Sequence, residues 1–191
     1  MSSRRGVAVS VQREEPLRRV RMSWEEFLEL PEWPRAEWVD GEAVIMNSPP
    51  LFRHGRAVMQ FGALLVPLFP EHHVVTEVYL RLPRNRVRLP DVMLTDTEPK
   101  DGCVSDPPLM VAEVLSLATR SEDTIRKPME YAKGGIGQYW VVDPWLRAID
   151  LWRNADGEWE LLARVDDDHP TAEVELAGVT VPIDLRRLLG D

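Results

Sequence analysis

Apolar and polar positions along the chain follow two different periods, and together they predict a mixture of helices and strands. Residues 109–115 and 138–143 are short and almost continuously apolar, which is typical of buried strands. A stretch from Arg53 to about Leu65 instead predicts an amphipathic helix, because its apolar residues recur at helical spacing, at Ala57, Val58, Phe61, Leu64 and Leu65.

Turn residues divide the remaining strand-forming runs. Asp40-Gly41 and Asp156-Gly157 are strong signals for two-residue turns. They predict two β-hairpins, at residues 36–46 and 148–165. Three further strand regions are expected, at residues 73–82, 86–95 and 173–182, the last as a short strand pair.

Capping and stop signals place the other helices. Ser23 with Glu26 three residues later forms a capping box, so a helix is predicted to start there and to end before Pro31. A second helix is expected between about Ser121 and Lys133, before two glycines, and Asp184 is expected to cap a last one. The order of elements predicts an α/β (mixed α+β) fold, with a central mixed β-sheet flanked by helices and additional β-hairpins.

Charge separates the N-terminus from the rest of the chain. Residues 1–21 carry six arginines against two glutamates, a balance of +4, and lack hydrophobic periodicity, so we expect a flexible basic arm. Residues 22–191 are expected to form a single domain. The total charge of −9 leaves −13 on that part, which argues against a protein that coats nucleic acid generally.

The composition also limits the cellular setting. The chain has one cysteine and no long apolar run, so neither an internal disulfide nor a membrane span is expected. Because a secretory signal is also missing from the N-terminus, we expect a cytoplasmic protein.

Two carboxylates interrupt strands that otherwise read as apolar. Glu113 lies in the middle of residues 109–115, and Asp91 lies in the run Leu-Pro-Asp-Val-Met-Leu. A carboxylate in dry surroundings needs a partner, which for each acid alone could be an arginine. For the two together we favour a shared divalent cation, Mg²⁺ or Mn²⁺, because carboxylate oxygens suit these ions. The four histidines lack the spacing of zinc ligands.

Pro90-Asp91 followed by Glu113 in an apolar strand resembles the signature of the restriction-endonuclease-like, PD-(D/E)XK nuclease superfamily. In that signature a lysine follows the second acid by two residues. Leu115 occupies that place here, so the plain motif fails.

The longer pattern is similar to the Uma-two family, a bacterial group classed as endonucleases. The matching residues extend from about Trp24 to Trp152. They are Glu37 to Glu42, with Asp40-Gly41 between them; His54; Pro90-Asp91; Glu113-Val114-Leu115-Ser116 with Thr119; Asp123, Lys127 and Tyr131; and Gly135, Tyr139-Trp140 and Asp143-Pro144.

This resemblance implies a restriction-endonuclease-like core and a set of site residues. Asp91, Glu113 and the main-chain carbonyl of Val114 would hold Mg²⁺ or Mn²⁺. The missing lysine would be Lys127, moved from the strand to the following helix. Pro128 directly after it predicts that the helix begins or is kinked there.

Two further matching residues each allow more than one role. Glu37 could complete the metal shell or bind a second ion, or be a surface acid on its hairpin. His54 could contact a phosphate or transfer a proton, or simply begin a helix.

The resemblance predicts a metal-dependent endonuclease that hydrolyses phosphodiester bonds in nucleic acid, with DNA as the expected substrate. The seven tryptophans fit a well-filled core or an apolar face for a homodimer. Two alternatives stay open. One is a non-cleaving nucleic-acid-binding or accessory protein that retains the nuclease fold. The other is a hydrolase that uses the two acids as a general acid/base pair, for instance on a glycoside.

Overall fold

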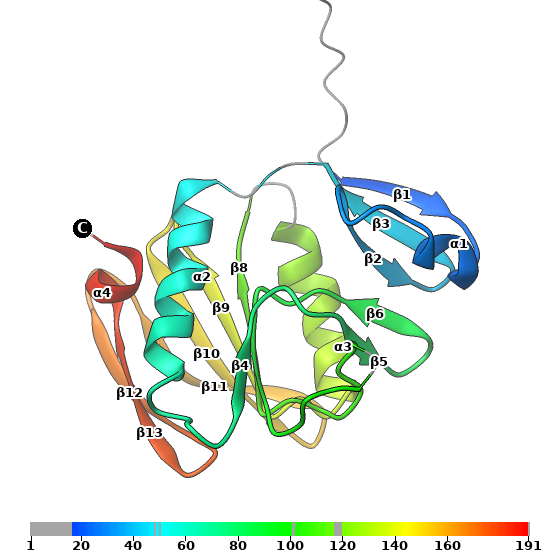
Figure 1. The fold of residues 1–191 in the computed structure, drawn as a ribbon. Coiled ribbons are helices and arrows are strands. Elements are labelled where there is room, and N and C mark those ends of the chain that lie inside the picture. The colour runs from blue at the N-terminus through cyan, green and yellow to red at the C-terminus, as the bar shows by residue number, and fades with distance from the viewer. Residues whose placement is uncertain (1–16, 48, 50, 101, 117–119, 191) are drawn as a thin grey trace, which may run out of the picture.

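The computed structural model describes residues 17–47, 49, 51–100, 102–116 and 120–190. Its strands form three sheets, and four α-helices and one π-helical segment are defined within the described residues (Figure 1). The helical elements are α1 (Trp24–Leu28), α2 (Phe52–Leu65), η1 (Glu122–Arg126), α3 (Lys127–Lys133) and α4 (Leu185–Leu189).

A six-stranded mixed sheet forms the centre of the molecule, in the order β11-β10-β9-β8-β7-β4. Only β8 and β9 run parallel; the other described pairs are antiparallel. The strands are β4 (His73–Val75), β7 (Val92–Thr95), β8 (Met110–Val114), β9 (Gln138–Asp143), β10 (Ala148–Ala155) and β11 (Glu158–Val165). The predicted central mixed sheet is therefore confirmed.

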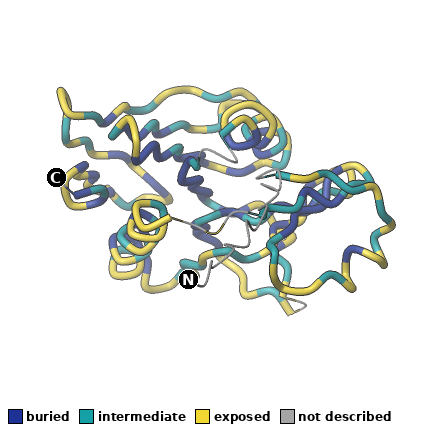
Figure 2. Tube along the Cα trace, turned by 90° about the horizontal axis from the view of Figure 1, so that it is seen from above, coloured by how far each residue is buried: buried dark blue, intermediate teal, exposed yellow. Residues whose placement is uncertain are grey.

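Successive side chains along these strands point to opposite faces of the sheet, and each face packs into its own hydrophobic core. One face carries Ala112, Val114 and Trp140 and packs with Phe61 and Leu65 of α2. On the other face, Val111 and Tyr139 pack with Tyr131 of α3. Figure 2 shows this sandwich from above, with buried strand positions between two helices whose outer faces are exposed. Glu113 shares its face with Val111, since alternate strand residues point the same way.

A smaller five-stranded antiparallel sheet lies beside α3, in the order β1-β3-β2-β6-β5 (Figure 1). Its strands are β1 (Leu17–Arg21), β2 (Arg35–Val39), β3 (Glu42–Met46), β5 (Leu80–Leu82) and β6 (Arg86–Arg88). The Asp40-Gly41 turn is confirmed, with both residues at positive φ (53° and 85°). Phe27 of α1 packs on Trp38 of β2, and the capping box of Ser23 is formed as predicted.

The last five residues of the predicted N-terminal arm belong to this sheet. Residues 17–21 form β1 and pair with β3 over their whole length, which corrects the expected boundary of the arm. Only Leu17 and Val20 of this strand are apolar, and both are half-buried, so hydrophobic periodicity alone does not distinguish the strand from a tail. Residues 1–16 lie outside the described part, and the assignment of residues 22–191 to one domain stays a prediction.

Two predicted strands are each divided between the two sheets. Residues 73–82 become β4 and β5, and residues 86–95 become β6 and β7. The first run breaks at Glu77, whose φ of 56° is incompatible with a strand. The second breaks at Pro90, which has no N–H for a ladder. Asp91 consequently lies just before β7 instead of inside a strand.

The C-terminal elements extend the core on the α2 side. β12 (Thr171–Leu176) and β13 (Val179–Asp184) form a separate hairpin, and Asp184 caps α4 as predicted. Val174, Ile183 and Leu185 join the core that contains α2. In the described part of the chain, every helix is too short or too polar to cross a lipid bilayer.

Candidate active site

Glu113 and Lys127 face each other from a strand and a helix. Nζ of Lys127, in the first residue of α3, lies 2.9 Å from Oε1 of Glu113 in β8. Both side chains are almost completely buried, at 4% and 2% exposure. The hydroxyl of Tyr131, one turn further along α3, donates a second hydrogen bond to the same carboxylate oxygen, at 2.6 Å.

Two more carboxylates surround the ammonium of Lys127. Oε1 of Glu37, from β2 of the small sheet, lies 3.1 Å from Nζ, and Oδ1 of Asp123 lies 3.0 Å away. Burial alone would lower the pKa of Lys127, but the charges of Asp123, Glu113 and Glu37 outweigh it and raise this pKa well above its usual value. The side chain therefore stays protonated at neutral pH.

A π-helical segment brings Lys127 inward. The backbone N–H of Lys127 donates to the carbonyl of Glu122, five residues earlier, instead of the usual four. Pro128 follows with no N–H, and its ring would clash with a carbonyl of a regular helix. The wider turn of η1 fits this proline without a break, since Lys127 keeps helical backbone angles (φ −57°, ψ −43°). The predicted disturbance at Pro128 is thus a local π-helical turn.

More negative than positive side chains surround Glu113. Burial raises the pKa of Glu113 well above its usual value, and the charges of Asp123, Asp91 and Glu37 add to this effect against the opposing charge of Lys127. Three carboxylates contact the single ammonium, so the cluster favours a further positive charge.

The side chain of Asp91 is hydrogen-bonded to the main chain of β8. Its Oδ2 accepts a hydrogen bond of 2.7 Å from the N–H of Val114, the residue after Glu113. Its Oδ1 lies 3.2 Å from Nε2 of His54, in the first turn of α2. Burial would lower the pKa of His54, but the hydrogen bond and charge of Asp91 raise it overall.

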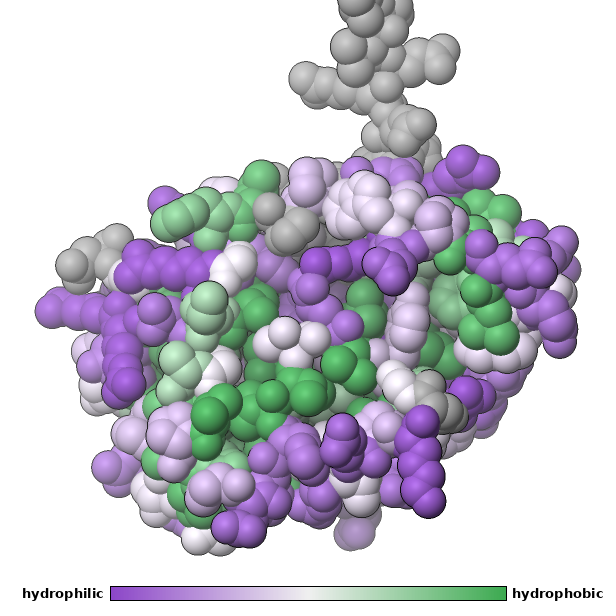
Figure 3. Space-filling view, viewed as in Figure 1, coloured by the Kyte–Doolittle hydropathy of each residue, from purple (hydrophilic) through white to green (hydrophobic). Residues whose placement is uncertain are grey.

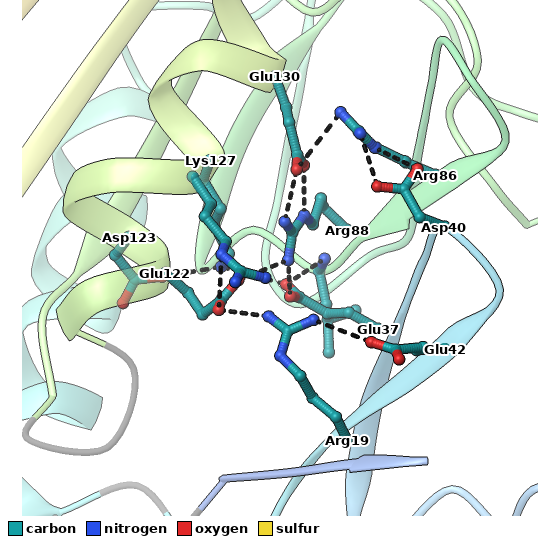
Figure 4. A network of polar contacts seen from close by, with 12 residues as sticks. Arg19, Glu37, Asp40, Glu42, Arg86, Arg88, Glu122, Asp123, Lys127 and Glu130 are labelled. Atoms are coloured by element: carbon teal, nitrogen blue, oxygen red, sulfur yellow. Dashed lines mark hydrogen bonds and ion pairs between the residues drawn. The ribbon is translucent and has the colours of Figure 1, made fainter. Parts of the chain in front are cut away.

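A buried arginine holds the opposite side of the cluster. Arg88, at the end of β6, is fully buried and donates to Oε2 of Glu37 at 2.8 Å and to both carboxylate oxygens of Glu130 in α3. Glu122 accepts a longer bond of 3.4 Å from Arg88 and also pairs with Arg19 of β1. Figure 4 shows these residues between the small sheet and the helix. The network therefore anchors η1 and α3 to the small sheet.

Glu37 is stabilised in its charged form by this arrangement. Burial would raise its pKa, but the charges of Lys127 and Arg88, together with hydrogen bonds from Arg88 and the N–H of Leu89, lower the pKa below its usual value. Glu37 is consequently a buried anion that contacts Lys127 and not a surface acid.

The structure brings all the predicted side chains into one connected cluster. Glu113, Lys127 and Glu37 meet directly, and Asp91 joins through Val114 and contacts His54. Thr119 lies outside the described residues. Arg88, Asp123 and Tyr131 also belong to this cluster, in addition to the predicted site residues. The sequence did contain a signal for Asp123 and Tyr131. Each is four residues from Lys127, and this spacing places all three side chains on one helix face.

The donors near Asp91 suit a hard divalent cation. Within the described residues, no group of three or more His, Cys, Asp or Glu side chains is arranged to hold a metal ion. Mg²⁺, however, needs only one or two carboxylates and keeps several waters. Asp91, just before β7, and Glu113, in the neighbouring β8, offer such a pair, and the negative charge around Glu113 favours a cation. The residues present therefore fit the predicted ion.

Comparisons with known proteins agree with the predicted resemblance. The family model for Uma2, described as "Putative restriction endonuclease", matches residues 24–185. A crystal structure of "a putative nuclease belonging to DUF820 from Anabaena variabilis ATCC 29413" superposes with a TM-score of 0.69 at 18% identity, covering 86% of this chain and 96% of that one. This confirms the fold. No curated protein matches the chain.

Proposed function

We propose that this chain, which belongs to the Uma2 family described as "Putative restriction endonuclease", is a metal-dependent endonuclease that hydrolyses phosphodiester bonds in DNA. The observation that carries the proposal is the contact of Lys127 with Glu113, next to the hydrogen bond from Val114 to Asp91. These contacts join the three groups that the reaction needs, although the usual position of the lysine is occupied by Leu115.

Asp91 and Glu113 would hold Mg²⁺ or Mn²⁺, with the main-chain carbonyl of Val114 as a third oxygen donor. The ion, when bound, supplies Lewis-acid polarisation of the phosphoryl oxygen and a more acidic water. His54 orients Asp91, and Tyr131 orients Glu113, because each donates to or pairs with that carboxylate.

Lys127 acts as a fixed positive charge in this proposal. Its raised pKa keeps the proton on Nζ, so it orients the attacking water and offsets the negative charge that develops on the phosphate. It does not serve as the base. Glu37 and Asp123 hold the ammonium in place, and Arg88 holds Glu37.

A non-cleaving protein is the alternative that a displaced Lys127 would favour, because Pro128 follows it directly. The contact between Nζ of Lys127 and Glu113 supports the cleaving protein instead. The proposal also includes a homodimer of this chain.

Incubation of supercoiled plasmid and single-stranded DNA with Mg²⁺ or Mn²⁺ tests the function. Asp91→Ala should abolish cleavage. Asp96→Ala is a matched control, since Asp96 follows the same strand and its side chain is 62% exposed. Equal background cleavage by the wild type and Asp91→Ala would refute the nuclease. Cleavage that persists at full rate in EDTA would instead favour a metal-free acid/base mechanism.

A further inference from the structure

A tyrosine of the central sheet is hydrogen-bonded to the main chain of the helical segment that leads to Lys127. Tyr139, in β9, is 1% exposed, and its hydroxyl donates to the main-chain carbonyl of Asp123 in η1 at 2.5 Å. Tyr139 pairs with Val111 of β8, and both side chains lie in the core on the face that carries Glu113. The bond therefore connects that face of the sheet to the π-helical turn.

The π-helical turn directs the usual donors of this carbonyl elsewhere. In an α-helix the N–H four residues later, that of Lys127, would donate to the carbonyl of Asp123. Here the same N–H donates to Glu122 instead. In a π-helix the donor would be one residue further on, at Pro128, which has no N–H. Tyr139 thus supplies the donor that neither helical register provides.

A second side chain of the same sheet holds the other end of the turn. Nε1 of Trp159, in β11, donates to the main-chain carbonyl of Pro128 at 2.8 Å, and its ring packs against Tyr139 at a centroid distance of 5.7 Å. The two accepting carbonyls lie on either side of Lys127 in the chain. Burial, as the largest cause, raises the pKa of Tyr139 well above its usual value, so the hydroxyl keeps the proton that it donates.

We propose that Tyr139 is a positioning residue: its hydrogen bond to the carbonyl of Asp123 holds η1 in the π-helical register that places Lys127 against the acids. The inference rests on the proposed function, because Lys127 orients the attacking water only from that position. It gives the helical segment a second support, from the central sheet, in addition to the one that Arg88 provides from the small sheet.

Tyr139 acts from the interior of the molecule. Figure 3 shows apolar side chains at the surface, over and beside α2, where Met59 is 70% exposed. These groups stay the same in a Tyr139→Phe variant, because phenylalanine keeps the buried ring and removes only the hydroxyl. A change in cleavage by this variant would therefore come from the bond to the helix and not from an altered surface for DNA or for a second copy of the chain.

Steady-state cleavage of plasmid DNA in Mg²⁺ measures the effect on the reaction. Tyr139→Phe should lower kcat at least about tenfold and leave KM unchanged, because it shifts Lys127 and not the groups that bind substrate. Tyr79→Phe is the matched control, since that hydroxyl also donates to a main-chain carbonyl, at 3.2 Å, but to Ala36 in β2. It should keep the wild-type kcat.

Pro128→Ala distinguishes a positioning role from a role in packing alone. The substituted residue has an N–H, so the carbonyl of Asp123 gains a main-chain donor in either helical register. In this background Tyr139→Phe should leave kcat unchanged, and the double variant should lose no more activity than Pro128→Ala alone. Losses that multiply would mean that the two substitutions act independently and would overturn the inference.

Hydrogen exchange followed by mass spectrometry gives a readout that does not depend on cleavage. The main-chain amides of residues 122–131 should exchange about 2- to 12-fold faster in Tyr139→Phe, the effect of one lost hydrogen bond, and at the wild-type rate in Tyr79→Phe. Faster exchange in Tyr139→Phe, together with a wild type that does not cleave DNA, would leave Tyr139 as the support of η1 and refute the nuclease. Unchanged kcat in Tyr139→Phe, with normal cleavage by the wild type, would overturn the positioning role and leave the nuclease.

Discussion

Replacement of Lys127 by methionine would test whether its ammonium balances a buried cluster of carboxylates. Methionine keeps a flexible apolar side chain of similar length, so the change removes mainly the charge. Three carboxylate oxygens lie within 3.1 Å of Nζ, and the side chain is 4% exposed. Removal of one partner from a buried ion pair costs about 3–5 kcal/mol, and we expect that loss in the free energy of unfolding at pH 7.

The stability loss of Lys127→Met should depend on pH in a definite direction. Without the ammonium, the folded-state pKa of Glu113, which burial already raises, should rise further above its unfolded value, near 4.5. A raised folded-state pKa favours the folded state below the unfolded pKa and loses that contribution as the pH rises. The deficit of Lys127→Met should therefore be largest at neutral pH and shrink towards pH 4.5.

Urea unfolding provides the assay, with a double-mutant cycle as its control. Glu113→Gln alone should cost about 1 kcal/mol, because an amide oxygen can still accept from Lys127 and Tyr131. The double variant Lys127→Met with Glu113→Gln should be more stable than the sum of the single losses by more than about 1 kcal/mol. A loss below about 1 kcal/mol in Lys127→Met, with an unchanged m-value, would show that water screens the cluster as it screens surface pairs and would refute the reasoning.

Three other predictions concern the groups around Lys127. Arg88→Met should lower the free energy of unfolding by about 3–5 kcal/mol, whereas Arg153→Met, which breaks an exposed pair with Glu160, should change it by less than about 1 kcal/mol; equal effects in urea would contradict the burial argument. Wild-type protein should lose stability as the pH falls below about 4.5, since the folded pKa of Glu37 is lowered, and the Tm of a Glu37→Gln variant should lack that part of the slope. Pro128→Ala should let η1 relax towards a regular helix, reducing DNA cleavage at least about tenfold without a loss of Tm; unchanged cleavage would show that the π-turn does not set the position of Lys127.

Local signals in the sequence were sufficient to predict the elements that depend on residues close together in the chain. The Asp-Gly turns determine two hairpins because φ above zero at both turn positions is cheapest for these residues. The continuous apolar run of β8 indicated a strand buried on both faces, and the carboxylate in it indicated a neutralising partner. These inferences need only a few adjacent residues.

The arrangement of strands into sheets could not be predicted in the same way. The chain crosses between the two sheets at Glu77 and at Pro90, where a strand pattern continues on both sides. Local periodicity is the same for one long strand and for two short ones in different sheets. Only long-range pairing, such as that of β6 with β2, distinguishes them.

The same limit explains why Arg88 was missed. In the sequence it is one of two arginines flanking a valine in a strand, a pattern typical of a solvated edge. Its burial arises because β6 pairs with β2 and so places it between Glu37 and Glu130, which lie 51 residues before and 42 residues after it. No spacing rule connects residues that far apart.

If Lys127 is the lysine of the proposed site, its position on α3 explains why the site needs the small sheet. A lysine at position 115 would project from β8 on the face of Glu113 and reach it without help from another element. A lysine on α3 must instead be aimed across a gap, and its long side chain has several rotatable bonds to fix. Glu37, anchored by Arg88, fixes the ammonium from the opposite side to Asp123. In the proposed reaction, a lysine placed on α3 therefore makes the buried network of the small sheet a positioning device. Replacement of Arg88 should therefore reduce cleavage more than a substitution in the distant β12–β13 hairpin that lowers the free energy of unfolding by the same amount.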